Sequence, residues 1–234
     1  MSSQAVAGSR TGRAGGLPAY GDGRRIVNAG RWFALALVLA LAAAPAAAQE
    51  RIRILAFGDS LTAGYGLAQE DSFPAQLQTA LRARGIDAEV INAGVSGDTT
   101  AGGLARLDWT LASPADFAIV ELGANDALRG LDPAAAEANL DAILGRLRQA
   151  GIGVLLAGML APRNLGPEYG AQFDPIFPRL ADRHGVAFYP FFLDGVAGKA
   201  ELNLPDGMHP NAAGVAQIVR RILPHVVKLT NGET

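Results

Sequence analysis

The chain has 234 residues, of which half are hydrophobic and 18% are charged, a composition typical of a folded domain and unlike that of a disordered chain. Its net charge of −2 provides no basic surplus for binding nucleic-acid phosphates. It contains no cysteine, which excludes disulfides, thiol nucleophiles and thiolate metal sites, and its histidines, His184, His209 and His225, follow no standard zinc spacing. We therefore expect no metal, no cofactor and no nucleic-acid partner.

The N-terminal segment is typical of an export signal. Three arginines, Arg24, Arg25 and Arg31, precede the apolar run 32–44, and small residues at 46–48 predict cleavage after Ala48. The apolar run is shorter than the roughly 20 residues that span a bilayer, so a permanent anchor is the weaker alternative. We predict a leader over 1–48, one domain over 49–234, a periplasmic or secreted location, no stable membrane span after processing and a monomer.

Beyond the leader, short apolar runs alternate with segments of helical periodicity, which predicts parallel strands joined by crossover helices. The clearest helix begins at Asp132 and Pro133, a cap followed by a first-turn proline, and ends at Gly151. Further helices are expected from 71–72 to 85, around 104–111, over 171–184 and from about 211 onward. Strands are expected at 53–57, 88–92, 117–122, 154–157 and 186–189.

Polar loops follow these strands. Gly58-Asp59-Ser60 follows the first strand, and loops are expected at 93–100, 123–126 and 159–170 after the next three. Because the carboxyl ends of parallel strands meet at one edge of a sheet, Ser60, Gly97 and Asn125 should lie close together. Taken separately, Gly-Asp-Ser is also an ordinary turn, and Asn125 could be a left-handed turn residue.

A serine becomes a good nucleophile when a histidine accepts its proton and a carboxylate orients that histidine. His209 is the best candidate, because Asp206 could bond its Nδ1 and leave Nε2 for Ser60. The same segment can also be interpreted as a helix start, and the two interpretations are compatible. His184 is interpreted as a structural residue at a helix C-terminus, and His225 as a surface residue. The Asn125 amide and the backbone N–H groups of Gly97 and Ser60 could stabilise an oxyanion.

Four sequence blocks carry a family resemblance: Gly58-Asp59-Ser60-Leu61, Gly97, Gly123-Ala124-Asn125-Asp126 and Asp206-x-x-His209-Pro210. In this order and spacing they resemble the blocks of the SGNH hydrolases, also called GDSL esterases/lipases. The longer strings 58–65, 96–99, 103–107 and 120–123 are similar to the periplasmic acyl-CoA thioesterase/lysophospholipase and arylesterase group of that family.

The resemblance implies a flavodoxin-like three-layer α/β/α domain with a mainly parallel sheet of about five strands. It implies Ser60 as nucleophile with Asp206 and His209 as partners, and an oxyanion hole made by Ser60, Gly97 and Asn125. The acyl site would be the loop after the fourth strand, with Met159, Leu160, Ala161 and Pro162. This loop departs from the relatives at Ala161 and Pro167, so their chain-length preference does not transfer.

The sequence therefore predicts a serine esterase that hydrolyses aryl esters, lysophospholipids and acyl thioesters through an acyl-enzyme intermediate. A carbohydrate O-acetyl esterase is an alternative, although the loops show no signature of sugar-stacking aromatic residues. A non-catalytic phosphate-binding module is a further alternative, but a phosphate site has no use for Asp206 and His209. Asp59 is expected to hold the turn and to have no catalytic role.

Overall fold

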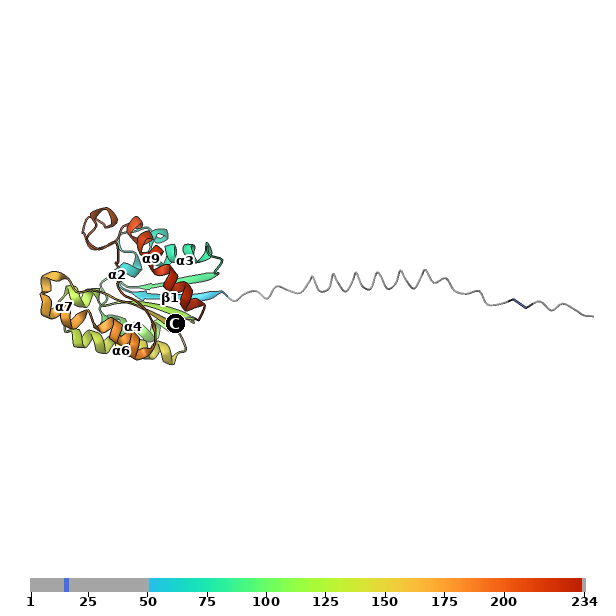
Figure 1. The fold of residues 1–234 in the computed structure, drawn as a ribbon, viewed down its shortest axis with the longest axis horizontal. Coiled ribbons are helices and arrows are strands. Elements are labelled where there is room, and N and C mark those ends of the chain that lie inside the picture. The colour runs from blue at the N-terminus through green and yellow to red at the C-terminus, as the bar shows by residue number, and fades with distance from the viewer. Residues whose placement is uncertain (1–14, 17–50, 233–234) are drawn as a thin grey trace, which may run out of the picture. The chain divides into compact units, whose positions relative to one another are not determined.

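Five parallel strands form one sheet with the order β2-β1-β3-β4-β5 (Figure 1). This confirms the predicted α/β class, and the order is that of flavodoxin-like folds. Between β1 and β3 the direction of strand succession reverses, which opens a crevice at the carboxyl ends of these two strands. The strands are β1 (Ile52–Gly58), β2 (Ala88–Gly94), β3 (Phe117–Glu121), β4 (Gly153–Ala157) and β5 (Ala187–Tyr189).

This computed structural model describes residues 15–16 and 51–232. The predicted signal and its cleavage after Ala48 fall outside the described residues, apart from 15–16. Within the described ranges, no helix combines the length and the apolar character that crossing a membrane requires.

Helices cover both faces of the sheet and make three layers (Figure 1). α3 (Phe73–Arg82) and α9 (Ala212–Thr230) pack against each other on one face. On the other face, α6 (Pro133–Gln149) packs between α4 (Thr100–Thr110) and α8 (Ile176–His184). The core is continuous through the layers, and its largest fully buried side chains include Phe57, Phe73, Phe173, Phe177 and Phe192.

Local sequence explains the two longest helices. The Asp132 side chain accepts a hydrogen bond from the Ala134 N–H at 2.9 Å, so α6 begins as predicted, and its stripe Leu140, Ile143, Leu144 and Leu147 is buried. Asn211 caps α9 in the same way through the Gly214 N–H, and Val215, Ile218, Val219 and Ile222 on its inner face are buried.

Three predictions of local structure are wrong. The segment 123–126 is not all loop, because α5 (Ala124–Leu128) begins after Gly123, whose φ is +113°. The segment 159–170 contains a 3₁₀ turn, η2 (Arg163–Leu165), and the start of α7 (Pro167–Phe173). The single helix predicted over 171–184 is two helices, because Pro175 has no N–H to continue the hydrogen-bond ladder and the Asp174 side chain bonds the Ala161 N–H instead.

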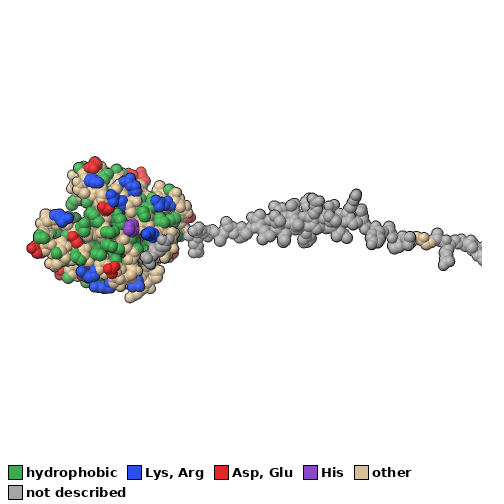
Figure 2. All heavy atoms as spheres, viewed as in Figure 1, with side chains coloured by type: hydrophobic (Ala, Val, Ile, Leu, Met, Phe, Trp, Pro, Cys, Tyr) green, Lys and Arg blue, Asp and Glu red, His purple; other side chains and the backbone are tan. Residues whose placement is uncertain are grey.

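Short elements complete the chain: α2 (Ser60–Ala63) and the 3₁₀ turns η1 (Gln69–Asp71) and η3 (Ala200–Leu202). Positive and negative side chains are interspersed on the face that Figure 2 shows, in keeping with the small net charge. No element of this architecture is specific to one chemistry, so function has to be argued from the edge where the strands end.

Candidate active site

Two glycines beside the turn after β1 have no room for a side chain: Gly58, which ends β1, and Gly94, which ends β2. A Cβ on Gly58 would lie 2.2 Å from Thr62 Oγ1 and 2.6 Å from the Glu121 carbonyl oxygen, and one on Gly94 would lie 2.3 Å from the Ala63 nitrogen. Asp59 caps α2, since its Oδ1 accepts a hydrogen bond from the Leu61 N–H at 2.9 Å. Ser60 is therefore fixed as the first residue of a short helix at the crevice.

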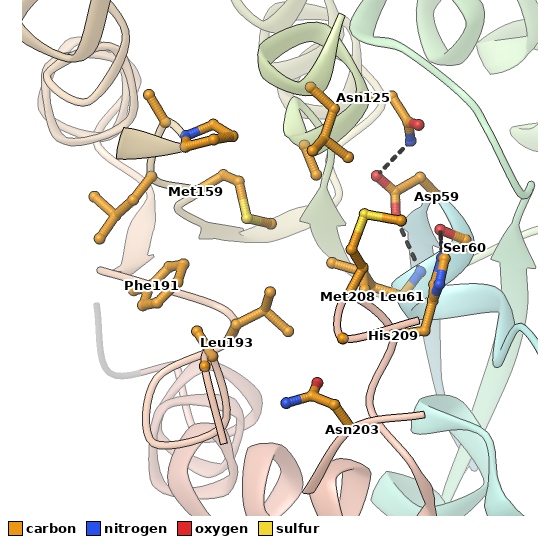
Figure 3. A pocket seen from close by; sticks show the side chains of 18 of the residues that line it. Asp59, Ser60, Leu61, Asn125, Met159, Phe191, Leu193, Asn203, Met208 and His209 are labelled. Carbon is orange, nitrogen blue, oxygen red and sulfur yellow. Dashed lines mark hydrogen bonds between the residues drawn. The ribbon is translucent and has the colours of Figure 1, made fainter. Parts of the chain in front are cut away.

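Ser60, His209 and Asp206 form one hydrogen-bonded series, and Figure 3 shows its contact between Ser60 and His209. Ser60 Oγ lies 3.0 Å from His209 Nε2, and His209 Nδ1 lies 2.7 Å from Asp206 Oδ2. A carboxylate only accepts, so Nδ1 carries the proton and Nε2 is left to accept from the serine hydroxyl. The separation of three residues suffices because the segment 206–209 turns sharply enough to return the carboxylate to the ring.

The same turn keeps Asp206 ionised. Its Oδ1 accepts hydrogen bonds from the backbone N–H groups of His209 and Met208, at 3.0 and 2.9 Å. These two bonds, followed by the bond to the His209 ring, lower the pKa of Asp206 to about 2. Asp206 therefore stays negative at neutral pH.

Two of the three predicted oxyanion donors face the same cavity. Asn125 lies in the first turn of α5, directly after β3, and its Nδ2 donates to Asp59 Oδ2 at 3.0 Å (Figure 3). Its place in a helix shows that the left-handed turn alternative is wrong. Gly97 lies in the loop after β2 with φ +84°, and its carbonyl accepts from Arg129 at 2.8 Å. Among the described residues that line the cavity, Ser60 and Asn125 are present and Gly97 is not.

A cavity of about 550 Å³ opens beside Ser60. Its polar end is formed by Asp59, Ser60, Asn125 and His209, and the rest of its wall is mainly hydrophobic. The four residues of the loop after β4 that were predicted to form the acyl site all line this cavity: Met159, Leu160, Ala161 and Pro162. Further side chains of the wall were not named from the sequence: Leu128, and Leu61, Phe191, Leu193 and Met208, which are labelled in Figure 3.

The model of the GDSL-like lipase/acylhydrolase family matches residues 56–217, about two thirds of the chain. The chain belongs to this family. The match begins inside β1 and ends inside α9, so it contains Ser60, Asn125 and His209. The protein is accordingly a GDSL-type serine esterase.

Individual relatives agree with this assignment. An arylesterase of Vibrio mimicus is 38% identical over 199 residues, which cover 85% of this chain and 98% of the relative. The thioesterase 1/protease 1/lysophospholipase L1 of Escherichia coli K12 is 38% identical over 79% of this chain and 86% of its own. The crystal structure of AlinE4, an SGNH-hydrolase family esterase, is 52% identical with a TM-score of 0.66, and covers 76% of this chain and 96% of that one.

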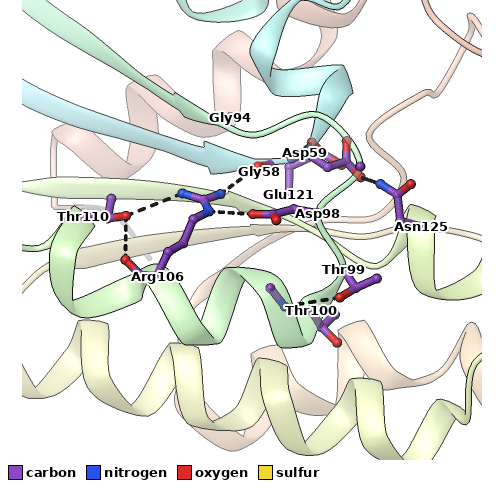
Figure 4. Close-up of polar contacts among 12 residues, drawn as sticks. Gly58, Asp59, Gly94, Asp98, Thr99, Thr100, Arg106, Thr110, Glu121 and Asn125 are labelled. Carbon is purple, nitrogen blue, oxygen red and sulfur yellow. Dashed lines mark hydrogen bonds and ion pairs between the residues drawn. The ribbon is translucent and has the colours of Figure 1, made fainter.

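Behind the surface of this GDSL esterase, two polar clusters connect the strand ends (Figure 4). In one, Arg106 of α4 bonds Asp98 Oδ2 at 2.5 Å and the Gly58 carbonyl at 2.9 Å, and its guanidinium stacks 4.2 Å above the Phe57 ring. Arg106 thereby joins the residue that follows Gly97 to the residue that precedes Asp59. Near this cluster, the Thr100 N–H and hydroxyl both donate to the carboxylate of Asp126, which neighbours Asn125.

The other cluster is the carboxyl pair Asp59 and Glu121, both fully buried. Glu121 ends β3, and its Oε2 accepts from the Thr62 hydroxyl at 2.8 Å and from the Asp59 N–H at 3.3 Å. Burial raises the pKa of both carboxyl groups above their usual range. Glu121 was not predicted as part of the site, because a glutamate at the end of an apolar run shows no sign of facing a second acid.

One aromatic side chain near the site and the two other histidines have packing partners in the structure. The Tyr65 ring packs on His209 with centroids 4.4 Å apart, a contact that the sequence analysis did not anticipate. His184 bonds Asp141 at 2.9 Å at the end of α8, which agrees with a structural residue. His225 is not a surface residue: it is half-buried and packs edge-on against Tyr189, with ring centroids 5.1 Å apart.

Proposed function

We propose that this esterase hydrolyses carboxylic esters, including aryl esters and lysophospholipids, and acyl thioesters through an acyl-enzyme intermediate on Ser60. The observation that supports it best is the continuous series from Ser60 Oγ through the His209 ring to Asp206, with contacts of 3.0 and 2.7 Å. This series opens onto a largely hydrophobic cavity, which suits a substrate with an acyl chain.

The reaction takes two steps. In the first, Ser60 Oγ attacks the acyl carbon while His209 Nε2 takes its proton, and Asp206 stabilises the imidazolium. His209 then passes this proton to the departing alcohol or thiol, and the acyl group stays on Ser60. In the second step, His209 takes a proton from water, which attacks the acyl-enzyme, and returns it to Ser60 as the carboxylic acid leaves.

The negative charge on the former carbonyl oxygen needs donors in both steps. The Asn125 amide supplies one N–H, and the backbone N–H groups of Ser60 and Gly97 supply the others. Removal of such a donor typically costs about 3–4 kcal/mol of transition-state stabilisation. Gly97 suits this role because it has no side chain between its N–H and the substrate.

The hydrophobic wall of the cavity would hold the acyl chain. Met159, Leu160, Ala161 and Pro162 form one side, and Phe191 with Leu193 the side that follows β5. The choice of aryl, lysophospholipid and thioester substrates follows the names of the two curated relatives.

The test compares S60A with wild type on p-nitrophenyl acyl esters and with a fluorophosphonate probe. Wild type is expected to turn over the esters and to be labelled, and S60A to do neither. S113A is the matched control, since Ser113 is exposed between α4 and β3 and should leave both readouts unchanged. Retention of the wild-type rate in S60A would overturn the assignment. A clear preference for acetylated xylan over longer acyl esters would favour the carbohydrate O-acetyl esterase.

We also propose that residues 1–48 direct export and that 49–234 is the mature, monomeric enzyme in the periplasm or outside the cell. Support comes from the arginines and the apolar run that precede Ala48. Sequencing the N-terminus of the exported protein is expected to give Gln49 as its first residue, and retention of residues 1–48 would contradict the proposal.

A further inference from the structure

Glu121 is buried beneath the turn that carries Ser60, and one of its carboxyl oxygens has no hydrogen-bond donor among the described residues. It has no exposed surface and makes no ion pair among the described residues. Its Oε2 receives two hydrogen bonds, whereas Oε1 is buried and receives none within the described ranges. A charged carboxylate oxygen without a donor is costly in the protein interior, and protonation turns that oxygen into a donor.

The acceptor that such a donor needs is the neighbouring carboxyl of Asp59, which is also fully buried. Asp59 receives one N–H on each oxygen, from Leu61 at 2.9 Å and from Asn125 at 3.0 Å. Two adjacent buried carboxyl groups do not both ionise readily, because their negative charges repel each other. The group that receives more hydrogen bonds from N–H donors is the one that ionises. Asp59 has donors that favour its charged form, so the proton belongs on Glu121.

The surroundings of Glu121 support the same assignment. Its partners across the sheet, Gly58 on β1 and Ala157 on β4, carry no charge. Arg106 of α4 is engaged with Asp98 and with the Gly58 carbonyl. On the α2 side Thr62 contributes only a hydroxyl. Burial, and then the negative charge of Asp59, raise the pKa of Glu121 well above its usual range.

We propose that Glu121 is a positioning residue for the oxyanion amide: its neutral carboxyl donates a hydrogen bond from Oε1 to the Asp59 carboxylate, which in turn holds Asn125. An ionised Asp59 can only accept, so it selects the orientation of the Asn125 amide in which Nδ2 faces it. The second N–H of that nitrogen is then free for the substrate. The catalytic consequence rests on the function proposed above.

Two substitutions of similar size separate this role from simple packing. In E121Q, the amide oxygen can accept from Thr62 and from the Asp59 N–H, and the amide nitrogen can donate to the Asp59 carboxylate. E121L can do neither. We expect E121L to lose about tenfold or more in kcat with little change in KM, and E121Q to recover most of that loss.

The loss in E121L should also depend on Asn125. If Glu121 acts through that amide, E121L costs much less kcat when it is introduced into N125A. An E121L enzyme with kcat within about twofold of wild type, or an equal loss with and without Asn125, would overturn the proposal. Failure of the esterase assignment itself would show instead in S60A, which would keep the wild-type rate.

Thermal unfolding tests the protonation state of Glu121 without an activity measurement. It can be measured on E121Q even if E121L fails to fold. The folded-state pKa of Glu121 is raised, so folding takes up a proton above about pH 4.5, and this contribution makes wild type less stable as pH rises. Glutamine has no such dependence. The Tm of E121Q should therefore exceed that of wild type, by a margin that grows by at least about 2 °C from pH 5 to pH 8.

E137Q is the matched control, because the hydrogen bond from Arg179 lowers the pKa of Glu137 and this glutamate is charged in the folded state. The Tm of E137Q should not exceed that of wild type at any pH above 5. If E121Q is less stable than wild type throughout this range, Glu121 is ionised in the fold and the proposal is wrong.

Discussion

Replacing Asn125 by alanine removes a side-chain donor at the polar end of the cavity and should lower kcat by about 100- to 1,000-fold, or about 3–4 kcal/mol. One N–H of this amide is committed to Asp59 at 3.0 Å, so the second is the one lost to the oxyanion. The acyl chain lies against other residues, and KM should change by no more than about threefold. Asp59 also loses a charge-assisted hydrogen bond, which should lower the stability by about 1–2 kcal/mol.

The assay is steady-state hydrolysis of a p-nitrophenyl acyl ester, with thermal unfolding measured in parallel. N139A is the matched control: Asn139 on α6 is also partly buried and donates Nδ2 to the Thr100 hydroxyl at 3.1 Å, but it does not line the cavity. Its kcat should stay close to that of wild type. If N125A keeps more than about a third of the wild-type kcat while S60A is inactive, the oxyanion is stabilised without this amide and the reasoning fails.

Three further substitutions test other parts of the site with the same assay. D206N can keep its backbone bonds but places an amide N–H against His209 Nδ1, so kcat should fall by about 10⁴-fold with little change in Tm; a loss below tenfold would contradict this. R106M breaks the bond to Asp98 behind the oxyanion loop, and both kcat and Tm should fall, whereas a wild-type kcat would show that the loop holds its place alone. A161F fills part of the acyl cavity, so kcat/KM should fall for long acyl esters more than for acetyl esters; an equal loss for both would place the chain elsewhere.

The sequence predicted the sheet and the Ser-His-Asp geometry well because both follow from local patterns. Apolar runs separated by amphipathic segments indicated all five strands, and parallel pairing brings their carboxyl ends to one edge. Asp206 and His209 are three residues apart, so their contact needs only a turn. The approach of Ser60 to His209 is a contact between residues 149 positions apart, and it was predicted from the chemistry of a serine that needs a histidine base oriented by a carboxylate.

The features that the sequence did not predict depend on contacts between distant segments. The break between α7 and α8 falls at Pro175, and the Asp174 side chain before it bonds the Ala161 N–H, thirteen residues earlier. The cavity wall from Phe191 and Leu193 belongs to a segment without helix or strand periodicity. Glu121 reaches the turn that follows β1 because β3 pairs with β1 in the register that sets it beside Gly58.

Three carboxyl groups lie near Ser60, and their surroundings give them different protonation states. Asp206 lies on an exposed turn with two backbone donors, which hold its pKa near 2 and keep a negative partner for the imidazolium. Asp59 and Glu121 lie next to the Asn125 amide, where burial raises both pKa values. Two unit charges 4 Å apart oppose each other by about 4 kcal/mol at an effective dielectric constant of 20. A second ionised carboxyl next to the Asn125 amide would therefore destabilise the negative oxyanion of the proposed reaction. When Glu121 keeps its proton, the single negative charge of Asp59 remains, and this charge orients the Asn125 amide.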